Sequence, residues 1–283
     1  MKALATSRTC QIVEALRDSD EKRVVLKTLR KDFRDDKEQI TQLKHEYTVG
    51  KGMKHPSVIR TLDFITENEI PCVVLECFSP LSLRQAIREQ FEETLFLVPQ
   101  VVRQTAEGLL YFHQQGWLHR DVKPDNFLVD SKGNIKLIDF SIAQKPKGTF
   151  SRLLGGKGKV QGTRSYMPPE QIRGETVDQR SDIYSLGCSL FELVTGRLPF
   201  TATSSDQLLQ KHLKTTVPAA KSANDNVTKP FSDLVERMMA KKKQNRPNNL
   251  HDFLNEYKKV KVFHVQPRRV EQSSRSAEET DPE

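Results

Sequence analysis

The densest group of chemically active side chains is the stretch 119–126, with the sequence HRDVKPDN, which lies between two apolar runs. Burying such polar groups without partners is costly, so the pattern predicts a loop that presents them to a ligand. Asp121 is a carboxylate placed to accept a proton from a hydroxyl group, and Lys123 is a point charge suited to a phosphate. The alternative is a plain polar turn in which Asp121 and Asn126 cap the backbone.

Two oxygen donors near this loop are suited to a hard cation. Asn126 ends the loop, and Asp139 follows it after the apolar-rich run 135–138. Magnesium in phosphoryl-transfer sites is held by a few protein groups together with substrate phosphates. Such reactions ask the protein mainly for positioning and for cations around the phosphates. Asn126 and Asp139 are therefore suited to be magnesium ligands in a reaction of this kind.

Three motifs follow one another in a fixed order: 119–126, then Asp139-Phe140-Ser141, then 168–170 with the sequence PPE. Their order and intervals resemble the H-R-D-x-K-x-x-N, D-F-G and A-P-E motifs of the protein kinase superfamily, of the eukaryotic-like (Hanks) type. The resemblance covers about 1–260. It implies an α+β bilobal fold, with a small antiparallel N-lobe sheet and helix C, and a larger, mainly helical C-lobe.

The resemblance implies a serine/threonine kinase that transfers the γ-phosphate of Mg-ATP to hydroxyl groups of a protein substrate. Asp121 is then the catalytic base, and Lys123 steadies the γ-phosphate. Thr163 lies in 162–170, GTRSYMPPE, which resembles the serine/threonine pattern G-T-x-x-Y-M-A-P-E. The implied domains are an N-lobe over 1–78 and a C-lobe over 79–262. The polar residues 263–283 are expected to be a disordered tail.

The elements that position the site are expected from the pattern of the chain. Strands are indicated at 11–16, 23–29, 61–65 and 72–76, and helices at 32–54, 82–90 and 99–115. By resemblance, Lys27 holds the α- and β-phosphates of the nucleotide, Glu46 pairs with Lys27, and Leu75 is the gatekeeper residue at the back of the adenine pocket. The resemblance also implies that Asp182 braces the backbone of the catalytic loop, 119–126, and that Arg246 pairs with Glu170. The implied nucleotide-binding residues are Val25, Lys27, Glu46, Glu76, Phe78, Lys123, Asn126, Leu128 and Asp139.

Three positions depart from the family pattern. The segment 5–12, ATSRTCQI, stands where the family has a glycine-rich phosphate lid and contains no glycine, although glycine permits close approach to a phosphate. We expect Thr6, Ser7, Thr9 or Arg8 to contact phosphate instead. Gly50 stands where the family has a bulky apolar residue, which predicts a mobile helix C. Ser141 replaces the glycine of D-F-G. These departures favour the alternative of a pseudokinase, a nucleotide-binding or interaction scaffold.

The segment 139–170 is expected to be the activation segment. It is rich in glycine and basic, with no acidic residue from Ser141 to Pro169. Thr149 and Ser151 are candidate phosphorylation sites. Thr163, which belongs to the same segment, together with Lys123 favours serine or threonine over tyrosine as the acceptor. A phosphate on this segment can pair with Arg120 or with the segment's own basic residues. The alternative is a merely disordered basic loop.

Composition limits the other functional classes. The 283 residues carry a formal net charge of +8 and four cysteines. The cysteines lack metal-site spacing, so they are expected to be reduced thiols of a cytoplasmic protein. There is no apolar run of about 18 residues, so no membrane span is expected. The basic charge permits acidic partners, but without a recognisable motif nucleic acid is an unlikely partner.

Overall fold

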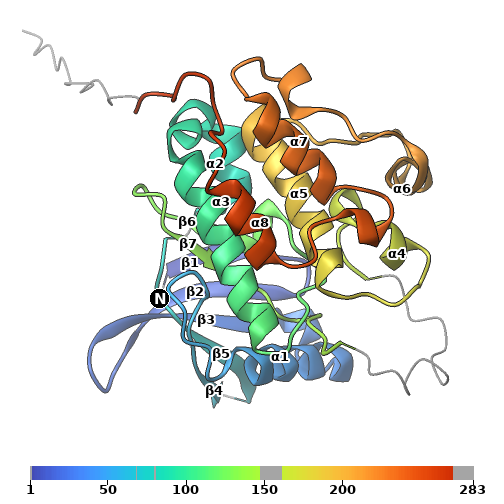
Figure 1. Cartoon of the computed structure of the whole chain (residues 1–283). Coiled ribbons are helices and arrows are strands. Elements are labelled where there is room, and N and C mark those ends of the chain that lie inside the picture. The colour runs from blue at the N-terminus through green and yellow to red at the C-terminus, as the bar shows by residue number, and fades with distance from the viewer. Residues whose placement is uncertain (1, 68, 80, 147–160, 270–283) are drawn as a thin grey trace, which may run out of the picture.

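The computed structural model describes residues 2–67, 69–79, 81–146 and 161–269. Figure 1 shows two parts: an antiparallel sheet with helix α1 at one end of the molecule, and a group of helices at the other. The α+β, bilobal fold expected from the sequence is therefore confirmed. No helix in the described ranges is long and apolar enough to span a membrane.

The N-lobe is a five-stranded sheet in the order β1-β2-β3-β5-β4, with every neighbouring pair antiparallel. Its central strands carry β-branched and apolar residues, as Val73 and Leu29 illustrate, and these are buried against Leu43 of α1. The expected strands are present, and β1 is an additional edge strand. The strands are β1 (Lys2–Thr6), β2 (Cys10–Arg17), β3 (Lys22–Leu29), β4 (Thr61–Glu67) and β5 (Ile70–Glu76).

Helix α1 (Lys37–Gly50) is shorter than the helix expected over 32–54. It begins where the Asp36 side chain accepts hydrogen bonds from the amides of Glu38 and Gln39, at 2.9 and 3.2 Å. This capping satisfies amides that have no partner inside the helix. Ahead of the cap, Lys31–Phe33 forms only a 3₁₀ turn. The helix carries Glu46 toward the sheet.

The C-lobe contains most of the apolar core. Helix α3 was expected to begin at Pro99, but it begins at Phe91 and includes Pro99. Leu95 and Val98 extend its buried face before the proline, so packing outweighs the missing amide hydrogen bond. The helices are α2 (Leu83–Glu89), α3 (Phe91–Gln114), α4 (Pro169–Ile172), α5 (Gln179–Thr195), α6 (Ser205–Lys214), α7 (Lys229–Met238) and α8 (Leu250–Tyr257).

A small second sheet, β6 (Phe127–Val129) with β7 (Ile135–Leu137), carries the residues that follow the catalytic loop. It contacts both lobes, because Leu137 forms a β-bridge with Val58 of the N-lobe and Leu128 forms one with Ser82 of the C-lobe. The sheet therefore fixes the positions of the end of the loop, just before β6, and of Asp139, just after β7.

The expected boundary between the C-lobe and a disordered tail at 262/263 differs from the structure. Phe263 is buried and forms a β-bridge with Val227, and the Asn226 side chain bonds to the backbone of Val265. The C-lobe therefore extends beyond 262. The rest of the expected tail, 270–283, lies outside the described residues.

Candidate active site

A buried carboxylate, that of Asp182, holds the backbone of the catalytic loop. Asp182 of α5 accepts hydrogen bonds from the amides of His119 and Arg120, both at 2.8 Å, and lies 2.8 Å from Nε2 of His113. Burial opposes ionisation, but the contact with His113 and these amides keep the pKa of Asp182 below its usual value. Arg120 has a positive φ of 67°, a backbone conformation that persists only when its surroundings enforce it. Asp182 supplies that constraint.

Asp121 is the centre of a short network. Its Oδ1 accepts from the amide of Thr163 at 2.7 Å, and its Oδ2 accepts from Nζ of Lys123 at 2.6 Å. The same Nζ donates to Oγ1 of Thr163 at 2.6 Å. Asn126 donates from Nδ2 to the backbone oxygen of Asp121 at 2.8 Å. The structure thus brings together four of the residues selected from the sequence, and it links the catalytic loop to the end of the expected activation segment.

Lys27 connects the two lobes. Its Nζ lies 2.6 Å from Oε2 of Glu46 on α1 and 3.1 Å from Oδ1 of Asp139. Burial alone lowers the pKa of Lys27, but Asp139 and Glu46 together raise it well above its usual value. The positive charge of Lys27 outweighs the effect of burial on Asp139, so the pKa of Asp139 is lowered. For Glu46 burial is the larger effect, and its pKa is raised. Lys27 is therefore a permanent cation at the point where the lobes meet.

Asp139 and Asn126 offer the oxygen atoms that a hard cation requires. Asp139 uses Oδ1 for Lys27, and its side chain is 34% exposed. Asn126 donates from its side-chain nitrogen Nδ2 to Asp121, which leaves its side-chain oxygen Oδ1 available. Within the described residues no group of three or more His, Cys, Asp or Glu forms a metal cage. This donor pair fits magnesium that is completed by phosphate oxygens and water.

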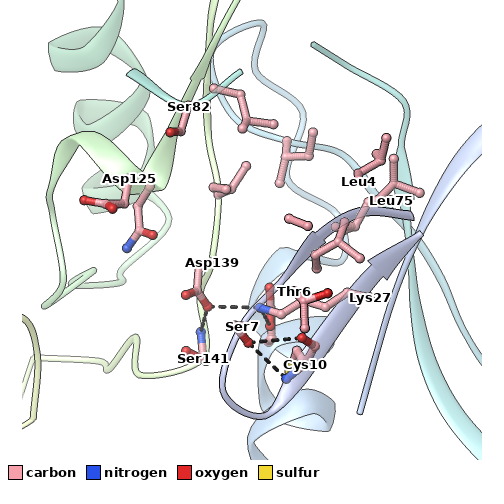
Figure 2. A pocket seen from close by; sticks show the side chains of 18 of the residues that line it. Leu4, Thr6, Ser7, Cys10, Lys27, Leu75, Ser82, Asp125, Asp139 and Ser141 are labelled. Carbon is pink, nitrogen blue, oxygen red and sulfur yellow. Dashed lines mark hydrogen bonds and ion pairs between the residues drawn. The ribbon is translucent and has the colours of Figure 1, made fainter. Parts of the chain in front are cut away.

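Ser141 does not strain the backbone after Asp139. The positive φ in this motif belongs to Asp139, at 63°, and Ser141 has no positive φ. The Ser141 amide lies 3.4 Å from Oδ1 of Asp139. The serine is therefore accommodated, and the Asp139 carboxylate remains directed into the cleft (Figure 2).

A cleft of about 480 Å³ lies between the lobes. Figure 2 shows the ion pair between Lys27 and Asp139 in the cleft, with Asp125 across from the β1–β2 hairpin. The amide of Glu76 is already bonded to the oxygen of Arg60, at 3.0 Å, so only the Glu76 carbonyl can meet a ligand there. Lys123 does not line this cleft and lies beside Thr163. The expected nucleotide residues that line it are Val25, Lys27, Glu46, Leu75, Glu76, Phe78, Asn126, Leu128 and Asp139.

The β1–β2 hairpin takes the place of a glycine-rich lid. Its turn is closed by Ser7, whose amide donates to the Cys10 oxygen at 2.8 Å and whose Oγ accepts from the Cys10 amide at 3.0 Å. Thr6, Ser7 and Thr9 line the cleft, whereas Arg8 is exposed and outside the lining. Cys10 also lines the cleft, a position that the sequence analysis did not single out. A serine side chain thus supports a turn that the family builds from glycine.

Gly50 is explained by a close contact rather than by looseness. A Cβ at this position would lie 2.1 Å from Oγ1 of Thr61 and 3.2 Å from Phe140. Phe140 in turn packs against Phe112, with ring centroids 5.1 Å apart. The glycine therefore lets α1 approach β4 and the Asp139-Phe140 turn. Nothing in this contact bears out the mobility expected for the helix.

A cluster that sequence reasoning missed surrounds Arg84 of α2. Its guanidinium pairs with Glu192 of α5 and with Asp125 of the catalytic loop, the latter at 3.3 Å. The Tyr166 hydroxyl donates to the other Glu192 oxygen at 2.6 Å. These residues are far apart in the sequence, so no local spacing could have indicated the cluster.

The pair expected between Arg246 and Glu170 is present and buried. Two guanidinium nitrogens meet the two carboxylate oxygens at 2.8 and 2.9 Å, and the side chains are 0% and 2% exposed. The pair holds the end of the segment that carries Thr163. The other two activation-segment candidates, Thr149 and Ser151, lie outside the described residues.

Known proteins share this sequence pattern. The protein kinase domain family matches residues 5–258. A probable serine/threonine-protein kinase of Clostridium perfringens is 32% identical over 258 residues, covering 91% of this chain and 37% of the relative. The serine/threonine-protein kinase PrkC of Bacillus subtilis is 33% identical over 237 residues, covering 82% of this chain and 36% of the relative. PknB of Mycobacterium tuberculosis is 29% identical over 227 residues, covering 79% and 36%.

The chain therefore spans little more than a third of the length of these curated relatives. The family match nevertheless spans both lobes and every residue that lines the cleft except Leu4. Together with the catalytic loop, the Lys27–Glu46 pair and the buried Arg246–Glu170 pair, it shows that the chain belongs to the protein kinase family, as a catalytic domain of the serine/threonine type.

Proposed function

We propose that this domain transfers the γ-phosphate of ATP to serine or threonine hydroxyl groups of a protein substrate. The observation that carries the proposal is the fixed position of Asp121. Two donors, the Thr163 amide and Lys123 Nζ, hold its carboxylate at 2.7 and 2.6 Å. A carboxylate held in this way is ready to accept a hydroxyl proton without reorganising.

The cations around the site suit the phosphate groups of the nucleotide. Lys123, beside Asp121, would steady the phosphate that is transferred. Lys27, oriented by Glu46, would hold the other phosphates. Asn126 and Asp139 would hold magnesium, which supplies positive charge to the phosphate oxygens.

The outer part of the cleft suits the adenine ring. Val25 and Leu128 lie on opposite lobes and would cover the two faces of the ring. The Glu76 carbonyl and the backbone of Phe78 would meet its polar edge, and Leu75 would limit the depth of the pocket. We also propose, from the sequence alone, that Thr149 or Ser151 receives a regulatory phosphate.

The direct test is transfer of radiolabelled phosphate from Mg-ATP to the protein itself and to acidic and basic protein substrates. Asp121→Asn is the matched control, because the amide keeps the shape of the side chain but is a far weaker base. We expect incorporation by the unchanged protein and a loss of at least about a hundredfold in the variant. Mapping the phosphate then tests Thr149 and Ser151.

Other outcomes are informative. ATP binding without transfer, under conditions that include a phosphorylated form of the domain, would contradict the proposal and indicate a nucleotide-binding scaffold. Transfer that persists in Asp121→Asn would contradict the role of Asp121 as the base.

A further inference from the structure

Arg164 stands next to the point where an acceptor must reach the site. Thr163 contacts Asp121 through its amide and Lys123 through its hydroxyl. A polypeptide that presents a hydroxyl group to Asp121 therefore passes over Thr163 and its neighbour. Arg164 is that neighbour, and its side chain is exposed.

The Arg164 guanidinium has no ion-pair or hydrogen-bond partner within the part of the chain that the structure describes. Its own segment cannot supply one, because the sequence from Ser141 to Pro169 contains no aspartate or glutamate. An exposed arginine with no internal carboxylate is available to an external one. Its planar group of donors binds a carboxylate through two parallel hydrogen bonds.

The carboxylates that could attract a basic substrate beside the catalytic loop are already engaged. Asp125 and Glu192 both pair with Arg84, whose side chain is only 13% exposed. Glu192 is also bonded to the Tyr166 hydroxyl and is buried. A lysine or arginine of a substrate would therefore have to compete with Arg84 for Asp125, and it could not reach the buried Glu192 without displacing Arg84.

Resting on the proposed kinase activity, we propose that Arg164 selects acceptor segments that carry an aspartate or glutamate within about two residues of the hydroxyl group. The reach follows from geometry, because an extended chain advances about 3.3 Å per residue and an arginine side chain spans about two such steps. The proposed substrate class is an acidic peptide segment, and Arg164 is the residue that binds its carboxylate.

The test compares peptides that have a threonine acceptor and one neighbouring position occupied by Asp, Ala or Lys. We expect the domain to favour the Asp peptide over the Lys peptide in kcat/KM by about fivefold or more, the size of an exposed ion pair. Arg164→Glu should reverse the order, and Arg164→Lys should keep it. The preference should weaken as salt is added.

Arg173→Ala is the matched control, since Arg173 is another exposed arginine near α4 and lies 3.9 Å from Glu175. The charge preference should not change in this variant. Equal use of all peptides, or an equal loss on all of them in Arg164→Glu, would overturn the proposal. Absence of transfer to any peptide would refute the proposed activity instead. Peptide binding, followed by fluorescence anisotropy, would still decide whether Arg164 selects acidic segments.

Discussion

The catalytic loop and the β1–β2 hairpin meet the same cleft but are held in different ways. The loop rests on the buried Asp182, which fixes two of its amides. The hairpin is held at its turn by local bonds between Ser7 and Cys10, and none of its residues is buried. The difference shows where sequence change is tolerated. A part fixed by buried polar contacts cannot vary without leaving unpaired groups, whereas an exposed hairpin can replace glycine by serine.

The largest expected effect is the loss of a buried ion pair in the C-lobe. Arg246→Met leaves Glu170 buried without its partner, although Arg246 normally keeps the pKa of this carboxyl low against the effect of burial. The free energy of unfolding should fall by about 3–5 kcal/mol, measured by urea denaturation. The control is Arg237→Met, whose pair with Glu256 is more than two-fifths exposed. It should cost about 1 kcal/mol or less. Similar losses in the two variants would contradict the view that buried polar contacts tolerate substitution less well than exposed ones.

An intermediate effect is expected where the N-lobe packs against Phe140. Gly50→Ala places a Cβ against the Oγ1 atom of Thr61. Rotation of that side chain would still leave the new Cβ 3.0 Å from Cβ of Thr61 and 3.2 Å from Phe140, so we expect α1 to shift and to carry Glu46 away from Lys27. Overpacking of this kind costs about 1–3 kcal/mol, and ATP affinity should fall with it. Calorimetric unfolding and ATP titration measure the two quantities. Adding Thr61→Ala removes the closest contact and should restore part of both, and no restoration would argue against the steric explanation.

The smallest effect is expected in the hairpin. Ser7→Ala removes the hydroxyl that accepts from the Cys10 amide, and an exposed hydrogen bond contributes about 1 kcal/mol or less. The midpoint of thermal unfolding and the KM for ATP should both change little. A loss of ATP affinity of about tenfold or more would instead show that Ser7 takes part in phosphate binding. The hairpin would then tolerate substitution as poorly as the catalytic loop.

The sequence predicted the site better than it predicted the boundaries of the elements. The residues that the structure brings together around Asp121 were selected from the sequence because three motifs keep their types and intervals. The start of α3 was missed because a proline suggested a first turn, while the buried stripe on both sides of it decided the outcome. The end of the C-lobe was missed because a largely polar stretch follows Phe263, and the burial of Phe263 depends on Val227, which lies far away in the chain.

By itself the sequence determined the family and the candidate reactive groups, because the polar residues of 119–126 and Asp139 follow one another in short, ordered spacings. Tertiary structure decided which of the remaining residues act together. Arg84 meets Glu192 across 108 positions of sequence, and Gly50 is needed only because Thr61 and Phe140 approach it. Such contacts come from folded surfaces that meet in space, and no local pattern specifies them. Residue type and spacing encode the reacting groups, whereas close packing between distant segments fixes their geometry.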